Sequence, residues 1–377
     1  MANVLLTGGR APATLHLLRL LHQAGHKVFQ ADSLPFPLAG ASRYCAASCR
    51  LPPPAFEPEA FAAVLGQWME EKAIDLLIPT CEEVFYVAQY RHLLPAVVFA
   101  PPMEVLRQLH SKWQFNQWLL ERGLPAVESQ LAIFSEVTPS DPPFYPAILK
   151  AEYTRFGTAV HLIREEADWA KCKARVAFKG RWVWQRYLNG AHWGTYSVAQ
   201  VGRLCAHVAY PLQWRYGAQG AATFFESVDC PDIERQVSEM VAALGYTGQI
   251  AFDFIRSAAD GRFYAIECNP RLTSGAHLFG PKDALANAFW GQSPLVRPSG
   301  PPVRLGVPMW LAAERHIFQA AFWRDWQRSQ EAVWQSRDPW PSVCQLPLMG
   351  YWGQLALRKG LGMTEATTWG IAWDGVV

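Results

Sequence analysis

The chain has 377 residues, of which 50% are hydrophobic and 18% are charged, with a formal net charge of +2. This length can bury two or three domain-sized cores, and this composition is typical of a globular protein rather than a disordered one. The 34 basic and 32 acidic residues are mixed along the chain without a basic stripe, so no nucleic-acid partner is expected.

The first hundred residues alternate short apolar runs with amphipathic segments, which predicts a doubly wound α/β unit. The expected strands and helices are strands 3–7, 27–32, 74–79 and 96–100 and helices 12–24 and 56–72. Gly8-Gly9 is interpreted as a tight turn into a helix that opens on Pro12. The G-x-G-x-x-G spacing of a dinucleotide-binding loop is absent there.

The segment Thr80-Cys81-Glu82-Glu83 follows the third of these strands, at the edge where α/β sheets place their ligands. Two interpretations fit its acidic residues. A solvated helix N-terminus favours negative charge, and a substrate contact from Glu82 or Glu83 is the alternative.

Beyond Pro101-Pro102, helices are expected at 104–110 and 112–122, and several prolines between 139 and 146 indicate an irregular connection. The next apolar run, 146–150, reads as a strand that ends on Lys150.

The strongest pattern is a pair of alternating runs, 248–255 and 262–271, joined by a Ser-Ala-Ala-Asp-Gly turn. This pattern predicts an antiparallel hairpin, which would bring Asp253 together with Glu267 and Asn269. Two carboxylates and an amide oxygen form an all-oxygen site suited to Mg²⁺, and phosphate oxygens would complete its coordination. A polar cluster inside an apolar strand indicates function rather than simple exposure.

The sequence Glu267-Cys268-Asn269-Pro270-Arg271 resembles the E-x-N-P-R signature of the ATP-grasp superfamily, in its carbamoyl-phosphate-synthetase and biotin-carboxylase branch. The resemblance covers roughly residues 1–290 and implies a mixed α/β and α+β fold. Three parts are expected: an α/β pre-ATP-grasp domain (1–105), a two-lobed ATP-grasp domain with antiparallel sheets (106–290, lid about 124–188) and a tryptophan-rich C-terminal extension (291–377).

The resemblance also implies roles for single residues. Asp253, Glu267 and Asn269 would hold one or two Mg²⁺ ions against ATP, and Arg271 would stabilise charge on the transferring phosphoryl group. Lys150 would act in catalysis as well as in nucleotide binding. The implied ATP contacts are Lys112, Lys150, Arg155, Thr158, Gln185, Arg186, Tyr187, Leu188 and His192.

Three features of this sequence depart from the family pattern. The loop after Lys150 contains only one glycine, Gly157, where the family's loop is richer in glycine. Gln185 and Arg186 stand where the family usually has a glutamate. His192 replaces another glutamate that lies near the ribose in many members, and a plain surface histidine is the alternative interpretation.

The resemblance implies a ligase that phosphorylates a small-molecule carboxylate to an acyl phosphate, couples it to an amine, and releases ADP and phosphate. Ser274, Gly275, His277 and Glu82 are the candidate substrate contacts. The alternatives are another ATP-grasp reaction (a small-molecule kinase or a carboxylase) and a non-catalytic nucleotide-binding module. A P-loop is excluded because G-x-x-x-x-G-K-[ST] is absent.

The part of the chain after residue 290 opens with prolines typical of a linker, and residues 310–334 have the periodicity of an amphipathic segment. Nine of the 17 tryptophans lie after residue 289, and they are expected in a core or an interface. The alternative is a roof over the site that favours an apolar substrate.

No run approaches the roughly 18 apolar residues that cross a bilayer, no signal peptide is recognised, and the eight cysteines form no CxxC pair. A cytoplasmic protein without a membrane partner is therefore expected, and a homodimer is left open.

Overall fold

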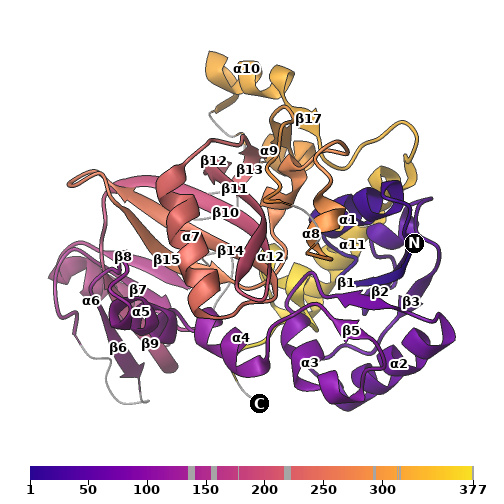
Figure 1. The fold of residues 1–377 in the computed structure, drawn as a ribbon. Coiled ribbons are helices and arrows are strands. Elements are labelled where there is room, and N and C mark those ends of the chain that lie inside the picture. Colours follow the sequence, from indigo (N-terminus) through magenta and orange to yellow (C-terminus); the bar gives the residue numbers. More distant parts are fainter. Residues whose placement is uncertain are drawn as a thin grey trace.

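The computed structural model describes residues 1–134, 141–153, 159–176, 178–215, 222–291, 294–311, 313 and 316–375. Within these residues the strands form four sheets, one parallel and three largely antiparallel. This mixed α/β architecture confirms the predicted fold class (Figure 1). No helix in the described part of the chain is long and apolar enough to cross a membrane.

The N-terminal unit is a parallel sheet in the order β3-β2-β1-β4-β5. Alternate residues of the central strand β1 face opposite sides of the sheet. Val4 and Leu6 pack against α1, while Leu5 packs against α2 and α3. Its elements are β1 (Asn3–Thr7), α1 (Pro12–Gln23), β2 (Lys27–Asp32), β3 (Ser48–Arg50), α2 (Pro58–Glu71), β4 (Leu76–Ile78), α3 (Val84–Gln89) and β5 (Val97–Val98). The strand β3 and the helix α3 were not predicted.

The turn after β1 is tight, as predicted. Gly8 has φ +72°, and a Cβ there would lie 2.7 Å from Thr80 Oγ1 and 2.9 Å from Glu83 Oε1. The helix α1 begins on Pro12. The solvated interpretation of Glu82 and Glu83 is wrong, since both side chains are only 2% exposed. Glu83 is buried because its carboxylate accepts hydrogen bonds from the Thr7 hydroxyl and from two backbone N–H groups.

The central sheet is antiparallel in the order β11-β10-β14-β15. Helices cover one of its faces, where Ile250, Phe252 and Phe254 pack with Phe115 and Val237. The intervening residues of the same strand therefore point to the opposite face. Its elements are β10 (Gly190–Gln200), β11 (Arg203–Pro211), β14 (Gly248–Ser257) and β15 (Phe263–Asn269), covered by α4 (Met103–His110), α5 (Lys112–Glu121) and α7 (Pro231–Ala243).

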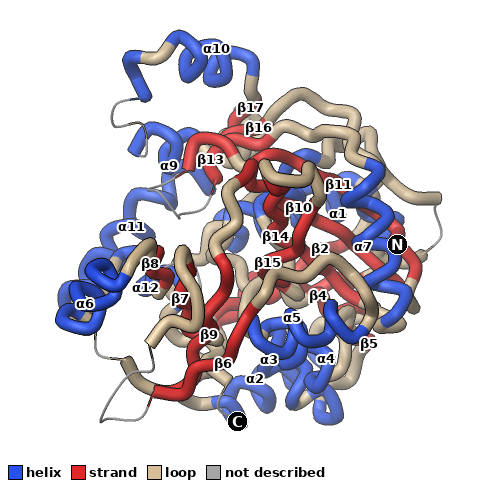
Figure 2. Tube along the Cα trace, turned by 90° about the vertical axis from the view of Figure 1, so that its left-hand side faces the viewer, coloured by secondary structure: helices blue, strands red, loops and turns tan. Residues whose placement is uncertain are grey.

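A second antiparallel sheet, in the order β6-β9-β7-β8, has its own core around Trp169 and Trp184. It falls within the segment predicted as the lid and lies beside the central sheet in both views (Figure 1, Figure 2). Its elements are β6 (Ser129–Phe134), β7 (Ala147–Ala151), β8 (Val160–Ile163), α6 (Glu166–Arg175) and β9 (Gly180–Arg186).

The C-terminal part shares a sheet with the middle of the chain, in the order β12-β13-β16-β17. The helix α10 projects at the periphery in both views (Figure 1, Figure 2). The elements are β12 (Gln213–Arg215), β13 (Ala222–Phe225), α8 (Leu285–Ala288), β16 (Val303–Arg304), α9 (Gly306–Leu311), α10 (Ala320–Arg328), β17 (Gln330–Glu331), α11 (Trp340–Lys359) and α12 (Met363–Thr368). The predicted domain boundaries stay predictions.

The tryptophans of this part divide into two groups. Trp310 and Trp334 are 55% and 54% exposed, so a place in the core is wrong for them. Trp373 is 1% exposed and belongs to the core of the N-terminal unit, where its ring stacks on Phe85 with centroids 4.6 Å apart. The chain therefore returns to its first domain at the far end of the described residues.

Candidate active site

The predicted hairpin is confirmed, with β14 and β15 paired antiparallel. Asp253 lies directly opposite Glu267, and Asn269 lies opposite Ala251, two residues from Asp253. Paired residues and residues two apart share a face, so these three polar side chains lie on one face of the central sheet. That face is the one turned away from the covering helices.

The charges around Asp253 suit a cation. Burial raises the pKa of Asp253, and the adjacent negative charge of Glu267 raises it further. Arg215, Lys150 and Arg271 act in the opposite direction. Two neighbouring carboxylates with an amide oxygen beside them are the ligand types that Mg²⁺ prefers, so the residues present fit a magnesium ion.

Lys150 reaches this face from the second sheet. Its side chain is 8% exposed, and Nζ donates to Gln185 Oε1 at 2.8 Å. Burial lowers the pKa of Lys150 to about 8, with Glu267 and Asp253 raising it and Lys112 lowering it. These mutual effects indicate that the Lys150 ammonium of the second sheet lies near the two carboxylates of the central sheet.

Lys112 is the first residue of α5, and Ser111 caps this helix by accepting from the Gln114 N–H. Lys112 is 6% exposed, so an ordinary surface lysine is excluded. Its Nζ donates to the Glu152 carbonyl at 3.4 Å, while the Glu152 side chain accepts from Ser111 and pairs with Arg181. A buried cation at a helix N-terminus suits an anionic ligand.

The end of β9 offers backbone groups to a ligand. Arg186 and Tyr187 donate their backbone N–H groups to the Glu128 and Pro146 carbonyls. Within the described residues the Leu188 N–H makes no such hydrogen bond. The Arg186 side chain pairs with Glu128 at 2.6 Å and lies over the Phe144 ring, so both its guanidinium and its backbone N–H already have protein partners. The Leu188 N–H is the donor at this strand end that remains for a nucleotide base.

His192 lies on β10, two residues before Gly194, which is paired with Asp253. Burial, together with the positive charges of Arg215 and Lys150, lowers the pKa of His192 to about 4. The imidazole is therefore neutral at pH 7 and lies near Arg215 and Lys150, while its side chain is half-buried. A role for His192 near the ribose stays a prediction. Arg155 and Thr158 lie outside the described residues.

Arg271 follows the hairpin and bridges it to the N-terminal unit. Its Nη2 donates to Asn269 Oδ1 at 3.3 Å, and the same atom lies 3.9 Å from Glu82 Oε1. Glu82 therefore lies at the candidate site, as a substrate contact would. However, its carboxylate faces the Arg271 guanidinium.

The other predicted substrate residues lie in the short 3₁₀ helix η3 (Ser274–Leu278). Ser274 begins this helix and is half-buried. Gly275 packs under Tyr210, where an added Cβ would lie 2.7 Å from the ring. His277 is 2% exposed, and its ring lies 5.1 Å from that of His16 on α1. His277 thus faces the N-terminal unit, and no contact with the carboxylate pair is found among the described residues.

Two residues near the site had no signal in the sequence. Tyr210 on β11 is paired with Gly194, so one row across the sheet reads Tyr210, Gly194, Asp253, Glu267. A Cβ on Gly194 would lie 2.9 Å from the Tyr210 ring, so the glycine leaves room for that ring. Arg215 on β12 acts electrostatically on Asp253. Only the strand register brings these residues together, which is why the sequence did not reveal them.

No protein-family model matches the sequence, and no curated protein has a significantly similar sequence. Solved structures do resemble the fold. An N5-carboxyaminoimidazole synthetase from Staphylococcus aureus is similar over 85% of this chain and 86% of its own, with a TM-score of 0.64 and 14% identity. An L-amino acid ligase from Bacillus licheniformis is similar over 80% and 78%, with a TM-score of 0.61 and 17% identity.

A biotin carboxylase from Campylobacter jejuni is also similar, over 77% of this chain and 70% of its own, with a TM-score of 0.58 and 20% identity. These three proteins share the ATP-grasp architecture. The chain therefore has an ATP-grasp fold, and at these identities the likeness extends to the fold alone.

Proposed function

We propose that the chain is an ATP-dependent ligase that joins a small-molecule carboxylate to an amine. A substrate carboxylate oxygen attacks the γ-phosphorus of ATP, the bond to the β,γ-bridging oxygen breaks, and ADP leaves. The amine nitrogen then attacks the carbonyl carbon of the acyl phosphate, inorganic phosphate leaves, and the nitrogen loses a proton.

The observation that carries this proposal is the proximity of a carboxylate pair on the central sheet to a buried lysine on the second sheet. Asp253 and Glu267 form a carboxylate pair on one sheet, while Lys150 on the other sheet and Lys112 beside it are buried cations. This arrangement matches a magnesium-bound triphosphate, which carries both a cation for the carboxylates and an anion for the lysines.

The residues of the chain would act mainly by position and charge. Asp253, Glu267 and Asn269 would hold Mg²⁺, which neutralises phosphate charge when bound. Lys112 and Lys150 would hold the phosphate oxygens. The backbone at Leu188 would bind the adenine, and the neutral His192 would lie near the ribose.

Arg271 would stabilise the charge that develops on the transferring phosphoryl group. Arg155 and Thr158 remain proposed phosphate contacts from the resemblance alone. Ser274 and Gly275 remain proposed substrate contacts beside Tyr210. His277, which faces α1, is a weaker fit to that role than the sequence suggested.

A second candidate is a carboxylase, supported by the comparable similarity to two carboxylating enzymes. The two functions differ in the acid that is phosphorylated. Labelled bicarbonate would be incorporated into product by a carboxylase, whereas a carboxylate–amine ligase would incorporate a labelled organic acid.

The deciding experiment measures ADP release from Mg-ATP with pooled carboxylates, with and without pooled amines. A ligase needs both pools, a kinase needs one, and a binding module releases no ADP above the level of a Glu267→Ala preparation purified in the same way. Absence of stimulation by any carboxylate, bicarbonate included, would contradict the proposal.

A further inference from the structure

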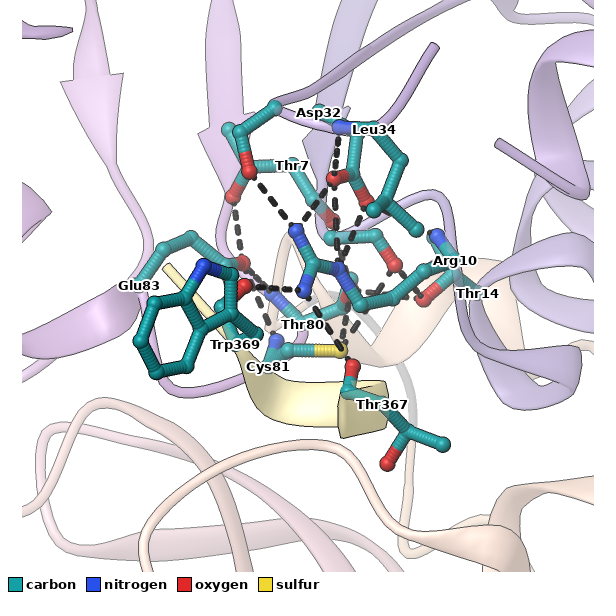
Figure 3. Close-up of polar contacts among 12 residues, drawn as sticks. Thr7, Arg10, Thr14, Asp32, Leu34, Thr80, Cys81, Glu83, Thr367 and Trp369 are labelled. Atoms are coloured by element: carbon teal, nitrogen blue, oxygen red, sulfur yellow. Dashed lines mark hydrogen bonds and ion pairs between the residues drawn. The ribbon is translucent and has the colours of Figure 1, made fainter. Parts of the chain in front are cut away.

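The carboxyl edge of the parallel sheet is contacted by the C-terminal part of the chain. The strand order reverses between β1 and β4, the place where an open α/β sheet usually binds its ligand. Arg10, in the turn after β1, is 4% exposed and pairs with Asp32 at the end of β2 at 2.6 Å (Figure 3). The remaining donor, Nη1, reaches the backbone carbonyls of Thr367 and Trp369 at 3.2 and 3.1 Å.

These two carbonyls belong to residues 367–375, here called the strap. The strap continues along the N-terminal unit and is held there through two of its carbonyls. The Ala55 N–H donates to the Gly370 carbonyl at 3.0 Å, and the Tyr86 hydroxyl donates to the Ala372 carbonyl at 2.9 Å. Trp373 then anchors the strap in the core of that unit.

Glu82 lies between the strap and the candidate active site. Its Oε2 accepts from the Trp373 backbone N–H at 3.4 Å, and its Oε1 lies 3.9 Å from Arg271 Nη2. Glu82 is 2% exposed, so the charge of its carboxylate is little screened by water. A carboxylate held on one side by a fixed N–H orients the guanidinium on its other side.

We propose that Glu82 is a positioning residue for Arg271 and that the strap holds Glu82 in place for this purpose. The proposal rests on the function proposed above, in which Arg271 acts on the transferring phosphoryl group. It replaces the substrate contact predicted for Glu82, because the carboxylate faces an arginine and the strap. The strap then becomes a required part of the active site, although it is about a hundred residues distant from Arg271 in sequence.

The test is a double-mutant cycle between Glu82→Gln and Arg271→Ala in the full chain. Gln keeps an acceptor for the Trp373 N–H but removes the charge opposite Arg271. We expect Glu82→Gln to lower kcat for ADP release by about tenfold to a hundredfold, a size typical of a misplaced catalytic group. The KM for Mg-ATP should stay within about twofold. In the Arg271→Ala background the same change should alter kcat by less than about twofold.

A matched control uses the adjacent carboxylate. Glu83→Gln removes a second buried carboxylate from the same turn, but Glu83 binds Thr7 and the backbone of its own turn rather than Arg271. In the double variant, the change in melting temperature caused by Glu83→Gln should add to the change caused by Arg271→Ala. Effects of Glu82→Gln on kcat that are additive with Arg271→Ala would overturn the proposal.

The strap itself is tested by a pair of glycines. Gly370 has φ +80°, and a Cβ there would lie 2.9 Å from Pro53 Cβ, so Gly370→Ala displaces the strap. Gly360 has φ +65° with no atom within 4 Å of its added Cβ, so Gly360→Ala carries similar backbone strain without the clash. Gly370→Ala should lower kcat as Glu82→Gln does, without adding to it, while Gly360→Ala should leave kcat unchanged. Equal kcat values for the two alanine variants would overturn the role of the strap.

A failure of the proposed ligase function can be distinguished from a failure of the positioning role of Glu82. If the wild-type chain releases no ADP, the same cycle measured on urea midpoints still reports whether Glu82 and Arg271 interact. Additive midpoint shifts would overturn the positioning role on their own. Coupled shifts without turnover would support the contact and contradict only the reaction.

Discussion

Lys150 and Gln185 meet across two neighbouring strands of the second sheet, with Nζ donating to Oε1 at 2.8 Å. The partner of this buried ammonium is a neutral amide. Since an amide offers no charge to offset burial, the pKa of Lys150 falls to about 8. The proposed nucleotide site therefore contains a cation whose charge is lost within a biochemically accessible pH range.

The first prediction concerns the pH dependence of nucleotide binding. Lys150 is protonated below a pH of about 8 and neutral above it. A triphosphate favours the charged form, so affinity for Mg-ATP should fall as pH rises above about 8, and binding there should take up a proton. Calorimetry in buffers of different ionisation enthalpy measures both effects. Lys150→Met should remove the proton uptake, and uptake that persists in this variant would contradict the assignment.

The second prediction concerns Gln185. Replacing it with glutamate gives Lys150 a charged partner, which raises the pKa of the lysine. Proton uptake on binding should then begin at a higher pH than in the wild type. Gln130→Glu on the adjacent strand β6 is the control, because Gln130 is exposed and lies opposite Trp184, whereas Lys150 donates to Gln185. An unchanged uptake profile in Gln185→Glu would contradict the role given to the Lys150–Gln185 contact.

The hairpin and the parallel sheet could be predicted because their signals are local. Alternation at 248–255 and 262–271 defines two strands, and the turn between them fixes which residues pair. The contact of Asp253 with Glu267 followed from that register. The burial of Glu82 and Glu83 could not be predicted, because their partners, Trp373 and Thr7, are distant in sequence.

The third prediction concerns the carboxylate pair. Glu267→Ala should lower turnover by roughly two to three orders of magnitude, a loss typical of one preorganised electrostatic group. ADP release at saturating Mg-ATP measures it. Asp260→Asn is the matched control, since Asp260 lies in the turn of the same hairpin, hydrogen-bonded to Tyr264 and away from Asp253. Near-normal turnover in Glu267→Ala would contradict the proposed site.

The fourth prediction concerns Gly194. An alanine here places its Cβ 2.9 Å from the Tyr210 ring, and such overpacking typically costs about 1–3 kcal/mol in the free energy of unfolding. Turnover should fall as well, because the displaced ring lies beside Asp253 in the same row of the sheet. Gly350→Ala is the control. Its added Cβ meets no atom within 4 Å inside α11, so it should stabilise the chain by roughly 0.5–1 kcal/mol. Urea denaturation compares the two variants.

The fifth prediction concerns the ion pair between Arg19 and Asp338, 2.9 Å apart and 1% and 0% exposed. Asp338 also accepts hydrogen bonds from the Ser42 hydroxyl and the Arg43 N–H. Asp338→Ala leaves a buried guanidinium without its carboxylate, so the free energy of unfolding should fall by about 3–5 kcal/mol. Arg235→Ala breaks exposed pairs on α7 and should cost less than about 1 kcal/mol. Similar costs for the two variants would contradict the burial of the pair.

The C-terminal part was the least predictable from the sequence. Only the segment 310–334 was expected to be amphipathic, and α10 within it is amphipathic as that pattern implies. The helices α11 and α12 were not predicted. However, β16 and β17 are two residues each, and each is defined by pairing with a strand distant in sequence: β16 pairs with β13, and β17 pairs with β16. The sequence shows only that tryptophans are frequent in this part of the chain. Whether a given ring is exposed, as in Trp310 and Trp334, or buried, as in Trp373, depends on tertiary packing.

The contact of Arg19 with Asp338 spans 319 residues, and the carbonyl of Trp369 is bound by Arg10 across 359. During synthesis the ribosome therefore releases the helix α1 and the turn after β1 long before their partners exist. The N-terminal sheet reaches its final packing only after residues 338–373 have emerged. A nascent chain arrested at residue 330 should consequently keep its first hundred residues sensitive to protease, whereas the released protein resists cleavage there.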